Sequence, residues 1–119
     1  MRGVVAIVGQ GYVGLPLAMA AARSGWSVIG IDVATSIVAG LNSGISHVED
    51  VANDELQRAL VAESYVASNK GEDVSDADVC VICVPTPLDS DQGPDLTFLE
   101  SAAKLVAPYV KPNALIVSE

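Results

Sequence analysis

Residues 4–22 of the chain read VVAIVGQGYVGLPLAMAAA. The stretch begins with β-branched residues typical of a buried strand, continues through three closely spaced glycines, and ends in an alanine-rich segment. In that last segment, apolar residues recur at helical spacing at Leu15, Ala18, Met19 and Ala22. A strand, a glycine-rich turn and a helix in this order indicate the first unit of a parallel α/β sheet.

A secretory signal peptide is the alternative interpretation of this stretch. Arg2 provides a positive charge before an apolar run, and residues 18–20 (Ala-Met-Ala) or 20–22 (Ala-Ala-Ala) resemble a small-residue cleavage site. However, the glycines between Gly9 and Gly14 and the proline at Pro16 interrupt the run, so no apolar segment of the required length remains. No stretch of about 20 predominantly apolar residues, the length of a membrane span, occurs in the chain. We therefore expect a soluble protein with no membrane partner.

The bulk composition bounds the class of protein. With 119 residues, 50% of them hydrophobic, the chain is expected to form one domain with an aliphatic core. Its formal net charge is -9 and its Lys and Arg residues form no cluster, so we expect no nucleic-acid partner. Of the acidic residues, Asp32 alone precedes Glu49. This isolation suggests a specific role for Asp32, although a solvated aspartate that ends a strand is the alternative.

The rest of the chain alternates apolar strands with segments of helical periodicity. The predicted strands span residues 3–9, 26–32, 65–67, 77–85 and 114–119, and the predicted helices span 13–24, 35–42, 53–63 and 96–107. Asp95 is expected to cap the last helix, and the strands at 77–85 and 114–119 are expected to be buried. The alternation predicts an α/β fold, in which a doubly wound parallel sheet of the Rossmann type forms the middle of a three-layer α/β/α sandwich.

Gly9, Gly11 and Gly14 form a G-x-G-x-x-G pattern between the first predicted strand and helix. We expect Gly9 to form the turn, Gly11 to let a diphosphate approach the backbone, and Gly14 to allow close packing of helix and strand. The amides of residues 11–14 then point at the diphosphate from the helix N-terminus, where the peptide dipoles favour negative charge. The alternative is a glycine-rich turn with no ligand, because the pattern alone is weakly specific.

Asp32 follows Gly14 by eighteen residues and ends the second predicted strand. An acidic residue about 20 residues after the glycine pattern is typical of the group that accepts hydrogen bonds from the adenosine ribose. Because a carboxylate there repels a 2′-phosphate, the sequence predicts NAD rather than NADP as the cofactor.

Cys80 and Cys83 form a C-x-x-C pair, which elsewhere indicates a redox dithiol or half of a zinc site. Here the pair lies in the predicted strand 77–85, where residues three apart point to opposite faces of the sheet. His47 is the only histidine in the sequence, so a metal site lacks ligands. We therefore expect no metal, and two buried, reduced, structural thiols in a cytoplasmic protein.

Four stretches of the chain resemble the UDP-glucose/GDP-mannose dehydrogenases, which are nucleotide-sugar 6-dehydrogenases. They are VGQGYVGLPLA (8–18), GID (30–32) followed by Leu41-Asn42, VCVICVPTPLD (79–89) and PDLTFLESAAKLVAPYVKP (94–112). The resemblance implies that residues 1–119 are the N-terminal NAD-binding domain. It also implies that Tyr12 and Val13 contact the dinucleotide and that Asp32 binds its ribose. Thr86 would lie against the cofactor; a loop residue held between two prolines is the alternative for Thr86.

The family oxidises the C6 alcohol of a nucleotide sugar to the carboxylate with two NAD, in polysaccharide biosynthesis. The resemblance thereby implies a UDP-sugar substrate. The segment GISHVED (44–50) is more similar to the corresponding segment of members that oxidise UDP-N-acetylglucosamine or UDP-N-acetylmannosamine than to that of members that use UDP-glucose. His47 either belongs to that signature or is a plain surface histidine. The nucleophilic cysteine, the central dimerisation helix and the C-terminal sugar-nucleotide domain of such proteins lie downstream. We therefore expect no catalytic residue within 1–119, and a homo-oligomer for the whole protein.

One position departs from the family pattern, because Ile37 stands where members often carry Lys or Arg near the adenosine. Two other interpretations share the glycine loop: a dehydrogenase of the 3-hydroxyacid or 6-phosphogluconate type, and a non-catalytic NAD-sensing module such as those of potassium channels. The stretches VPTP (84–87) and PDL (94–96) argue against the first of these. The coding sequence after Glu119 would test the second: a downstream cysteine in a glycine-rich context supports the dehydrogenase, whereas a stop or a transport module supports the sensor.

Overall fold

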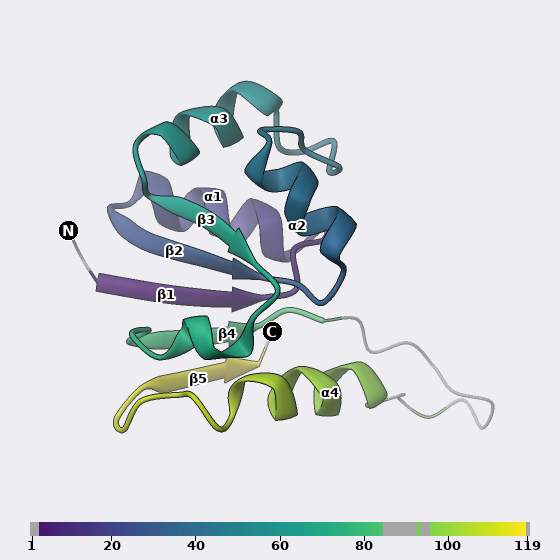
Figure 1. Cartoon of the computed structure of the whole chain (residues 1–119), viewed down its shortest axis with the longest axis vertical. Coiled ribbons are helices and arrows are strands. Elements are labelled where there is room, and N and C mark those ends of the chain that lie inside the picture. The colour runs from purple at the N-terminus through teal and green to yellow at the C-terminus, as the bar shows by residue number, and fades with distance from the viewer. Residues whose placement is uncertain (1–2, 85–92, 94–95, 119) are drawn as a thin grey trace.

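The computed structural model describes residues 3–84, 93 and 96–118. Its centre is a five-stranded parallel sheet with the strand order β3-β2-β1-β4-β5 (Figure 1). The strands are β1 (Gly3–Val8), β2 (Trp26–Ile31), β3 (Tyr65–Ser68), β4 (Val79–Ile82) and β5 (Leu115–Ser118). The helices are α1 (Gly14–Arg23), α2 (Thr35–Asn42), α3 (Asn53–Val61) and α4 (Thr97–Val106), and a short 3-10 turn spans Gly71–Val74. The predicted fold class is confirmed.

Helices cover both faces of the sheet, with α1, α2 and α3 on one face and α4 on the other (Figure 1). The alternation of side chains along β1 accounts for this arrangement. Val5 and Ile7 pack into the core on the α1–α3 side, whereas Ala6 and Val8 pack into the core on the α4 side. Strands that are apolar on both faces are typical of parallel sheets covered by helices, and here they produce two aliphatic cores.

The sheet has a topological switch point at the carboxyl end of β1. From this strand, β2 and β3 extend the sheet in one direction and β4 and β5 extend it in the other. Val8, the last residue of β1, pairs with Ile31 on β2 and with Ile82 on β4, so the three strands end level with one another. Ligands of open parallel sheets bind outside the carboxyl ends of the strands at such a point.

The last strands and helix differ from the prediction. β4 ends at Ile82, three residues before the predicted end, and α4 begins at Thr97, one residue later than predicted. β5 is not buried: 60% of Leu115 and 48% of Ile116 are exposed, because β5 is an edge strand with only β4 beside it in the described part of the sheet. Asp95, the predicted cap of α4, lies outside the described residues.

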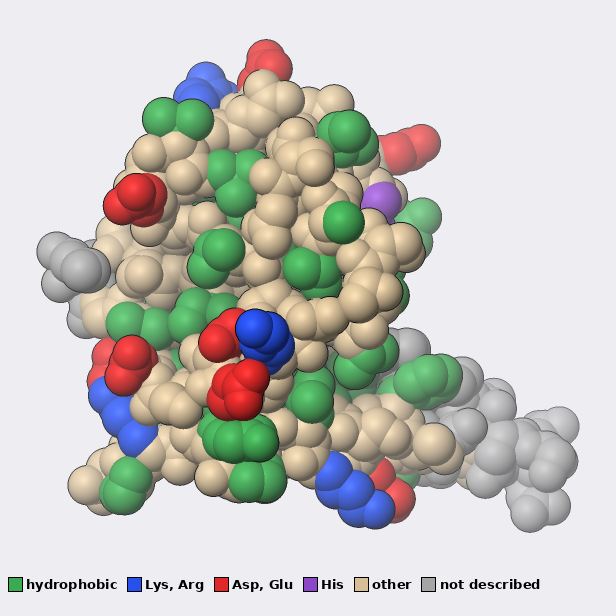
Figure 2. Space-filling view, viewed as in Figure 1, with side chains coloured by type: hydrophobic (Ala, Val, Ile, Leu, Met, Phe, Trp, Pro, Cys, Tyr) green, Lys and Arg blue, Asp and Glu red, His purple; other side chains and the backbone are tan. Residues whose placement is uncertain are grey.

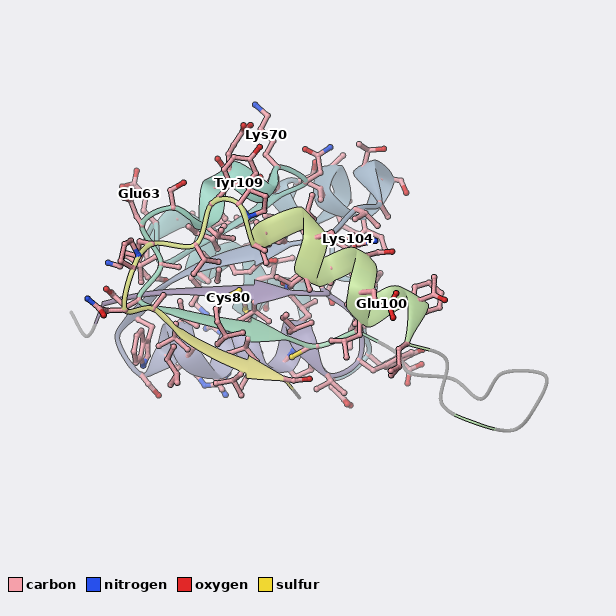
Figure 3. The ribbon with its side chains drawn as sticks, turned by 90° about the horizontal axis from the view of Figure 1, so that it is seen from below. Glu63, Lys70, Cys80, Glu100, Lys104 and Tyr109 are labelled. Atoms are coloured by element: carbon pink, nitrogen blue, oxygen red, sulfur yellow. The ribbon has the colours of Figure 1, made fainter. Side chains whose placement is uncertain are left out.

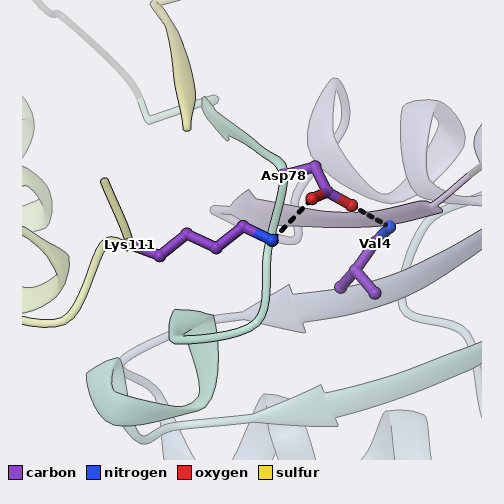
Figure 4. A network of polar contacts seen from close by, with 3 residues as sticks. All are labelled: Val4, Asp78 and Lys111. Atoms are coloured by element: carbon purple, nitrogen blue, oxygen red, sulfur yellow. Dashed lines mark hydrogen bonds and ion pairs between the residues drawn. The ribbon is translucent and has the colours of Figure 1, made fainter. Parts of the chain in front are cut away.

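At the amino ends of the strands, Asp78 connects three segments (Figure 4). One carboxylate oxygen accepts a hydrogen bond from Lys111 Nζ at 2.6 Å, and the other accepts one from the Val4 amide at 3.0 Å. The bond from Lys111, and then the bond from Val4, hold the pKa of the Asp78 carboxyl below its usual range. Val4 belongs to β1, while Asp78 and Lys111 precede β4 and β5, so this network aligns the strands at the edge opposite the glycines.

The surface carries charges of both signs. Basic side chains (blue) and acidic side chains (red) are interspersed on the face shown in Figure 2. Ion pairs join Arg23 to Glu55 and Lys111 to Asp78. No helix within the described ranges has the length and apolar character needed to cross a membrane.

Candidate functional site

The glycine loop, residues 9–13, connects β1 to α1 at the carboxyl edge of the sheet. Gly9 has a φ of +97°, in the left-handed region that favours glycine. Its amide donates a hydrogen bond to the Ile31 carbonyl at 2.7 Å, and a Cβ at Gly9 would lie less than 3.0 Å from the Cys83 carbonyl. The turn and the close approach of the ends of β2 and β4 therefore both require glycine at this position.

Gly14 and Gly11 differ in their surroundings. A Cβ at Gly14, the first residue of α1, would collide with the carbonyl of Gly9, so close packing of the helix start against the loop requires glycine there. A Cβ at Gly11 would meet no atom of the described residues within 4 Å. The fold itself therefore gives no reason for glycine at Gly11, on the open side of the loop.

The N-terminus of α1 begins directly after this loop. Its N-cap residue, Val13, forms no capping hydrogen bond through its side chain, and the first turn contains no acidic residue. The partial positive charge of the helix N-terminus is therefore not neutralised by this segment, which favours an anion beside the loop.

Asp32 lies at the carboxyl end of β2, next to the glycine loop. Its Oδ2 atom accepts a hydrogen bond from the Gln10 amide at 3.0 Å, and its Oδ1 atom accepts one from the Ala34 amide at 3.0 Å. Because an ionised carboxylate has about four lone-pair sites, both oxygens keep the capacity to accept a hydrogen bond from a ligand hydroxyl. The structure thus brings Asp32 and the loop together, as the spacing predicted.

A cavity of about 640 Å³ opens between the glycine loop, the ends of β2 and β4, and α4. Its volume lies in the range of about 300–1,000 Å³ that is typical of small-molecule sites. The predicted residues that line it are Gly9, Gly11, Tyr12, Val13 and Asp32. Gly14 is buried behind the loop, whereas 77% of Tyr12 and 55% of Val13 are exposed and can contact a ligand.

Several residues that line the cavity were not predicted from the sequence. Val33 and Val84 each lie two residues after the ends of β2 and β4, which flank β1, so their position at the switch point was a signal that could have identified them. Phe98 and Ser101 lie on α4, and only the packing of this helix brings them to the cavity. Thr86, which the resemblance places against the cofactor, lies outside the described residues.

The two cysteines point to opposite faces of the sheet, as predicted. Cys80 is buried in the core on the α4 side, in the sheet layer seen in Figure 3, and burial raises the pKa of its thiol. Cys83 packs against the other core and is only half-buried, because it lines the cavity. The expectation of a buried thiol is therefore confirmed for Cys80 and wrong for Cys83. In the described part of the chain, no group of three or more His, Cys, Asp or Glu residues could hold a metal ion.

Ile37 and His47 both make contacts that the sequence did not reveal. Ile37 is half-buried and packs against the core on the α1–α3 side, so this position serves packing instead of carrying a cation. His47 is exposed, but its Nε2 atom lies 2.7 Å from the carbonyl oxygen of Gln10. It is therefore tied to the glycine loop and is not a plain surface histidine.

Comparison with known proteins identifies the family of this chain. Residues 3–119 match the sequence profile described as UDP-glucose/GDP-mannose dehydrogenase family, NAD binding domain. A UDP-N-acetyl-D-mannosamine dehydrogenase of Pyrococcus horikoshii is 36% identical over 116 residues, which are 97% of this chain and 28% of the relative. An NDP-N-acetyl-D-galactosaminuronic acid dehydrogenase of Ralstonia solanacearum is 37% identical over 115 residues, which are 97% of this chain and 27% of the relative. The chain thus spans a little over a quarter of the length of these relatives.

Solved structures lead to the same family. A UDP-D-ManNAc dehydrogenase from Pyrococcus horikoshii superimposes with a TM-score of 0.91 at 36% identity, over 98% of this chain and 28% of that chain. A ternary complex of GDP-mannose dehydrogenase from Pseudomonas aeruginosa gives a TM-score of 0.87 at 28% identity, over 99% of this chain and 28% of that chain. These matches set aside the hydroxyacid-dehydrogenase and sensor interpretations. The chain belongs to the UDP-glucose/GDP-mannose dehydrogenase family, in which it is an NAD-binding domain.

Proposed function

We propose that this chain is the cofactor-binding part of an NAD-dependent nucleotide-sugar dehydrogenase whose substrate is a UDP-N-acetylhexosamine. The relatives support this substrate class, since they include UDP-N-acetyl-D-mannosamine and NDP-N-acetyl-D-galactosaminuronic acid dehydrogenases. In the proposed reaction, the C6 alcohol of the sugar, two NAD⁺ and one water become the C6 carboxylate, two NADH and three protons. Two successive two-electron oxidations therefore account for the two NADH.

Gly11 is the observation that best supports a role of the loop in holding the diphosphate of NAD. Glycine at this position has no structural reason within the described fold, and its open side faces the cavity beside the N-terminus of α1. A ligand group that approaches the backbone closely explains why a side chain is absent there. Bound NAD supplies the hydride acceptor, whereas the loop only binds and orients the cofactor.

The other proposed contacts follow from position in the same cavity. Asp32 accepts hydrogen bonds from the two ribose hydroxyls with the lone pairs that Gln10 and Ala34 leave available. Tyr12 and Val13 contribute exposed contact surface. Thr86 is assigned to the cofactor by the family resemblance alone.

The remainder of the proposed enzyme is assigned to sequence outside residues 1–119. We propose that it supplies the nucleophilic cysteine, a central dimerisation helix and a sugar-nucleotide domain, so that this chain alone binds NAD but catalyses no reaction. The whole protein is proposed to act as a cytoplasmic homo-oligomer in polysaccharide biosynthesis. The buried thiol of Cys80, which forms no disulfide, supports a reducing compartment.

Replacing Gly11 with alanine is expected to weaken NAD binding about tenfold while leaving the free energy of unfolding nearly unchanged. The added methyl group meets no protein atom of the described structure, but it occupies space that the diphosphate needs, and one lost backbone hydrogen bond to a charged group accounts for a change of this size. Calorimetric titration with NAD and thermal unfolding of the same variant measure the two effects. A stable variant with unchanged affinity would contradict the assignment of the diphosphate to Gly11.

The proposed activity is tested with the full-length protein that contains this chain. The protein is incubated with NAD and, in separate reactions, with UDP-N-acetylglucosamine, UDP-N-acetylmannosamine, UDP-glucose and GDP-mannose, and the NADH formed per sugar is counted. Two NADH per sugar with a UDP-N-acetylhexosamine are expected. Two NADH with UDP-glucose or GDP-mannose alone would overturn the substrate class, and measurable NAD binding with no turnover of any sugar would overturn the enzyme.

A further inference from the structure

Gln10, which lies between Gly9 and Gly11, is the one buried polar residue in the core of the described structure. Its side-chain amide nitrogen donates hydrogen bonds to the carbonyls of Ile7 at 2.9 Å and of Gly9 at 3.1 Å. Its amide oxygen accepts a hydrogen bond from the Tyr65 hydroxyl at 2.7 Å. Both polar atoms of the side chain thus form hydrogen bonds within the fold. These side-chain hydrogen bonds, together with those of the Gln10 backbone described below, hold the loop from the core side and are called the Gln10 brace.

Tyr65 and the two backbone carbonyls fix the orientation of this amide. Burial, and to a smaller extent the charge of Asp32, raise the pKa of the Tyr65 hydroxyl, so the hydroxyl stays protonated and donates its hydrogen bond. The carbonyls of Ile7 and Gly9 can only accept, so they face the amide nitrogen of Gln10, and its amide oxygen accepts the hydrogen bond from the hydroxyl. A phenylalanine at this position would leave the buried oxygen without its partner.

Gly30, on β2, leaves space for the hydrogen bond between Gln10 and Tyr65. A Cβ at Gly30, on β2, would lie less than 3.0 Å from both the Gln10 amide oxygen and the Tyr65 hydroxyl. Gly30 has no positive φ that would require glycine for backbone reasons. The absence of a side chain at Gly30 is therefore explained by the hydrogen bond between Gln10 and Tyr65.

The backbone of Gln10 is held as firmly as its side chain. Its amide donates to Asp32 Oδ2 at 3.0 Å, and its carbonyl oxygen lies 2.7 Å from His47 Nε2, on the segment between α2 and α3. A carbonyl can only accept, so His47 carries its proton on Nε2 and donates it to Gln10. One peptide segment thus connects the carboxylate of Asp32, the glycine loop and the α2–α3 segment.

We infer that His47 and Tyr65 are positioning residues for NAD, which act through Gln10 to hold the glycine loop and the Asp32 carboxylate in the binding conformation before NAD arrives. Neither His47 nor Tyr65 lines the cavity, so their effect on binding is indirect. The inference rests on the proposed roles of the loop and of Asp32 in NAD binding. It predicts that removing either donor weakens NAD binding, because part of the binding free energy is then spent on ordering the loop.

His47 offers the sharper test, because its side chain is exposed and its replacement leaves the core intact. In the full-length protein, His47→Ala is expected to raise the Kd and the KM for NAD about five- to tenfold, with kcat and the thermal unfolding midpoint nearly unchanged. His47→Gln places an N–H donor near the position of Nε2 and is expected to restore the affinity. Glu49→Gln, at a neighbouring exposed position of the same segment, is the control and is expected to bind NAD normally.

Substitution of Tyr65 tests the hydrogen bond to the side chain of Gln10. Tyr65→Phe is expected to lower both stability and NAD affinity, since the buried Gln10 oxygen loses its partner. In the double variant Gln10→Met/Tyr65→Phe, the amide oxygen and the hydroxyl are both removed, so stability is expected to recover in part, limited by the Ile7 and Gly9 carbonyls that lose their donor, while the affinity stays at least about fivefold weak. Affinity that recovers together with stability would show that Tyr65 is merely structural.

The outcomes separate this inference from the proposed function. If the unsubstituted protein binds NAD and His47→Ala binds it equally well, the positioning role of His47 is overturned while the proposed function stands. The same holds if His47→Gln binds as weakly as His47→Ala, because the hydrogen bond is then not the cause. If the unsubstituted protein does not bind NAD, the proposed function and this inference both fail.

Discussion

Replacing Asp32 with alanine is expected to raise the Kd for NAD about a hundredfold or more. A hydrogen bond to a charged group contributes about 1.5–3 kcal/mol, and the proposed site makes two such bonds to the ribose, so their loss costs about 3–6 kcal/mol. The Kd for NADP is expected to rise far less, because the same substitution removes the repulsion between the carboxylate and a 2′-phosphate. Titration of the full-length variant with both dinucleotides measures the change in preference.

The change in preference distinguishes ribose binding from a structural effect of Asp32. Its carboxylate also accepts hydrogen bonds from Gln10 and Ala34, so a loop disturbed by the substitution would weaken NAD and NADP equally. Equal losses for both dinucleotides would therefore contradict the assignment of Asp32 to the ribose. Asp76→Ala removes the same charge from an exposed position that does not line the cavity, and it is expected to leave both affinities unchanged.

Replacing Gly14 with alanine is expected to lower the free energy of unfolding by about 3 kcal/mol or more and to abolish NAD binding with it. The added Cβ would collide with the backbone carbonyl of Gly9, and neither the helix start nor the loop can move without disturbing the contacts of Gly9 with β2 and β4. Overpacking of this kind typically costs about 1–3 kcal/mol and more where backbone is the obstacle. Chemical denaturation of the variant measures the loss.

Gly40→Ala is the matched control for this substitution. Gly40 lies within α2, and a Cβ there would meet only the Ile45 carbonyl, at 3.9 Å, which is ordinary contact. Alanine in a helix interior is favoured over glycine by about 0.5–1 kcal/mol, so this variant is expected to be at least as stable as the unsubstituted protein. A Gly14→Ala variant of unchanged stability would show that α1 is not held against the loop as the structure has it.

Much of the fold was predictable because its signals are local. Each signal involves only residues close together in the sequence. They are the helical spacing after Gly14, the β-branched run before Gly9 and the glycines that end α1 and α2. The order of strands and helices then leaves a parallel sheet as the consistent arrangement. The distance of Asp32 from the glycine pattern extends the same reasoning, because a helix and a strand of ordinary length return the chain to the edge where it started.

The failures of prediction concern element boundaries and the packing of distant segments. The apolar sequence of β5 indicated a buried strand, but an edge strand keeps the same apolar pattern when nothing in the described structure covers it. No local signal assigned Phe98 to the site, and it lines the cavity only because α4 packs there. Cys83 carries the pattern of a buried strand, but the strand ends before it at Ile82.

Local chemistry is therefore responsible for the strands, the helices, the glycine turn and the position of Asp32, since hydrophobic periodicity and backbone sterics operate between near neighbours in the chain. Long-range packing is responsible for the cavity and for the Gln10 brace, in which Tyr65 and His47 lie 55 and 37 residues from Gln10 in sequence. The sequence next to a buried amide does not identify its hydrogen-bond partners, because folding brings these partners from distant segments. Its hydrogen bonds must nevertheless be satisfied, because an unpaired polar group in the core costs about 1–3 kcal/mol.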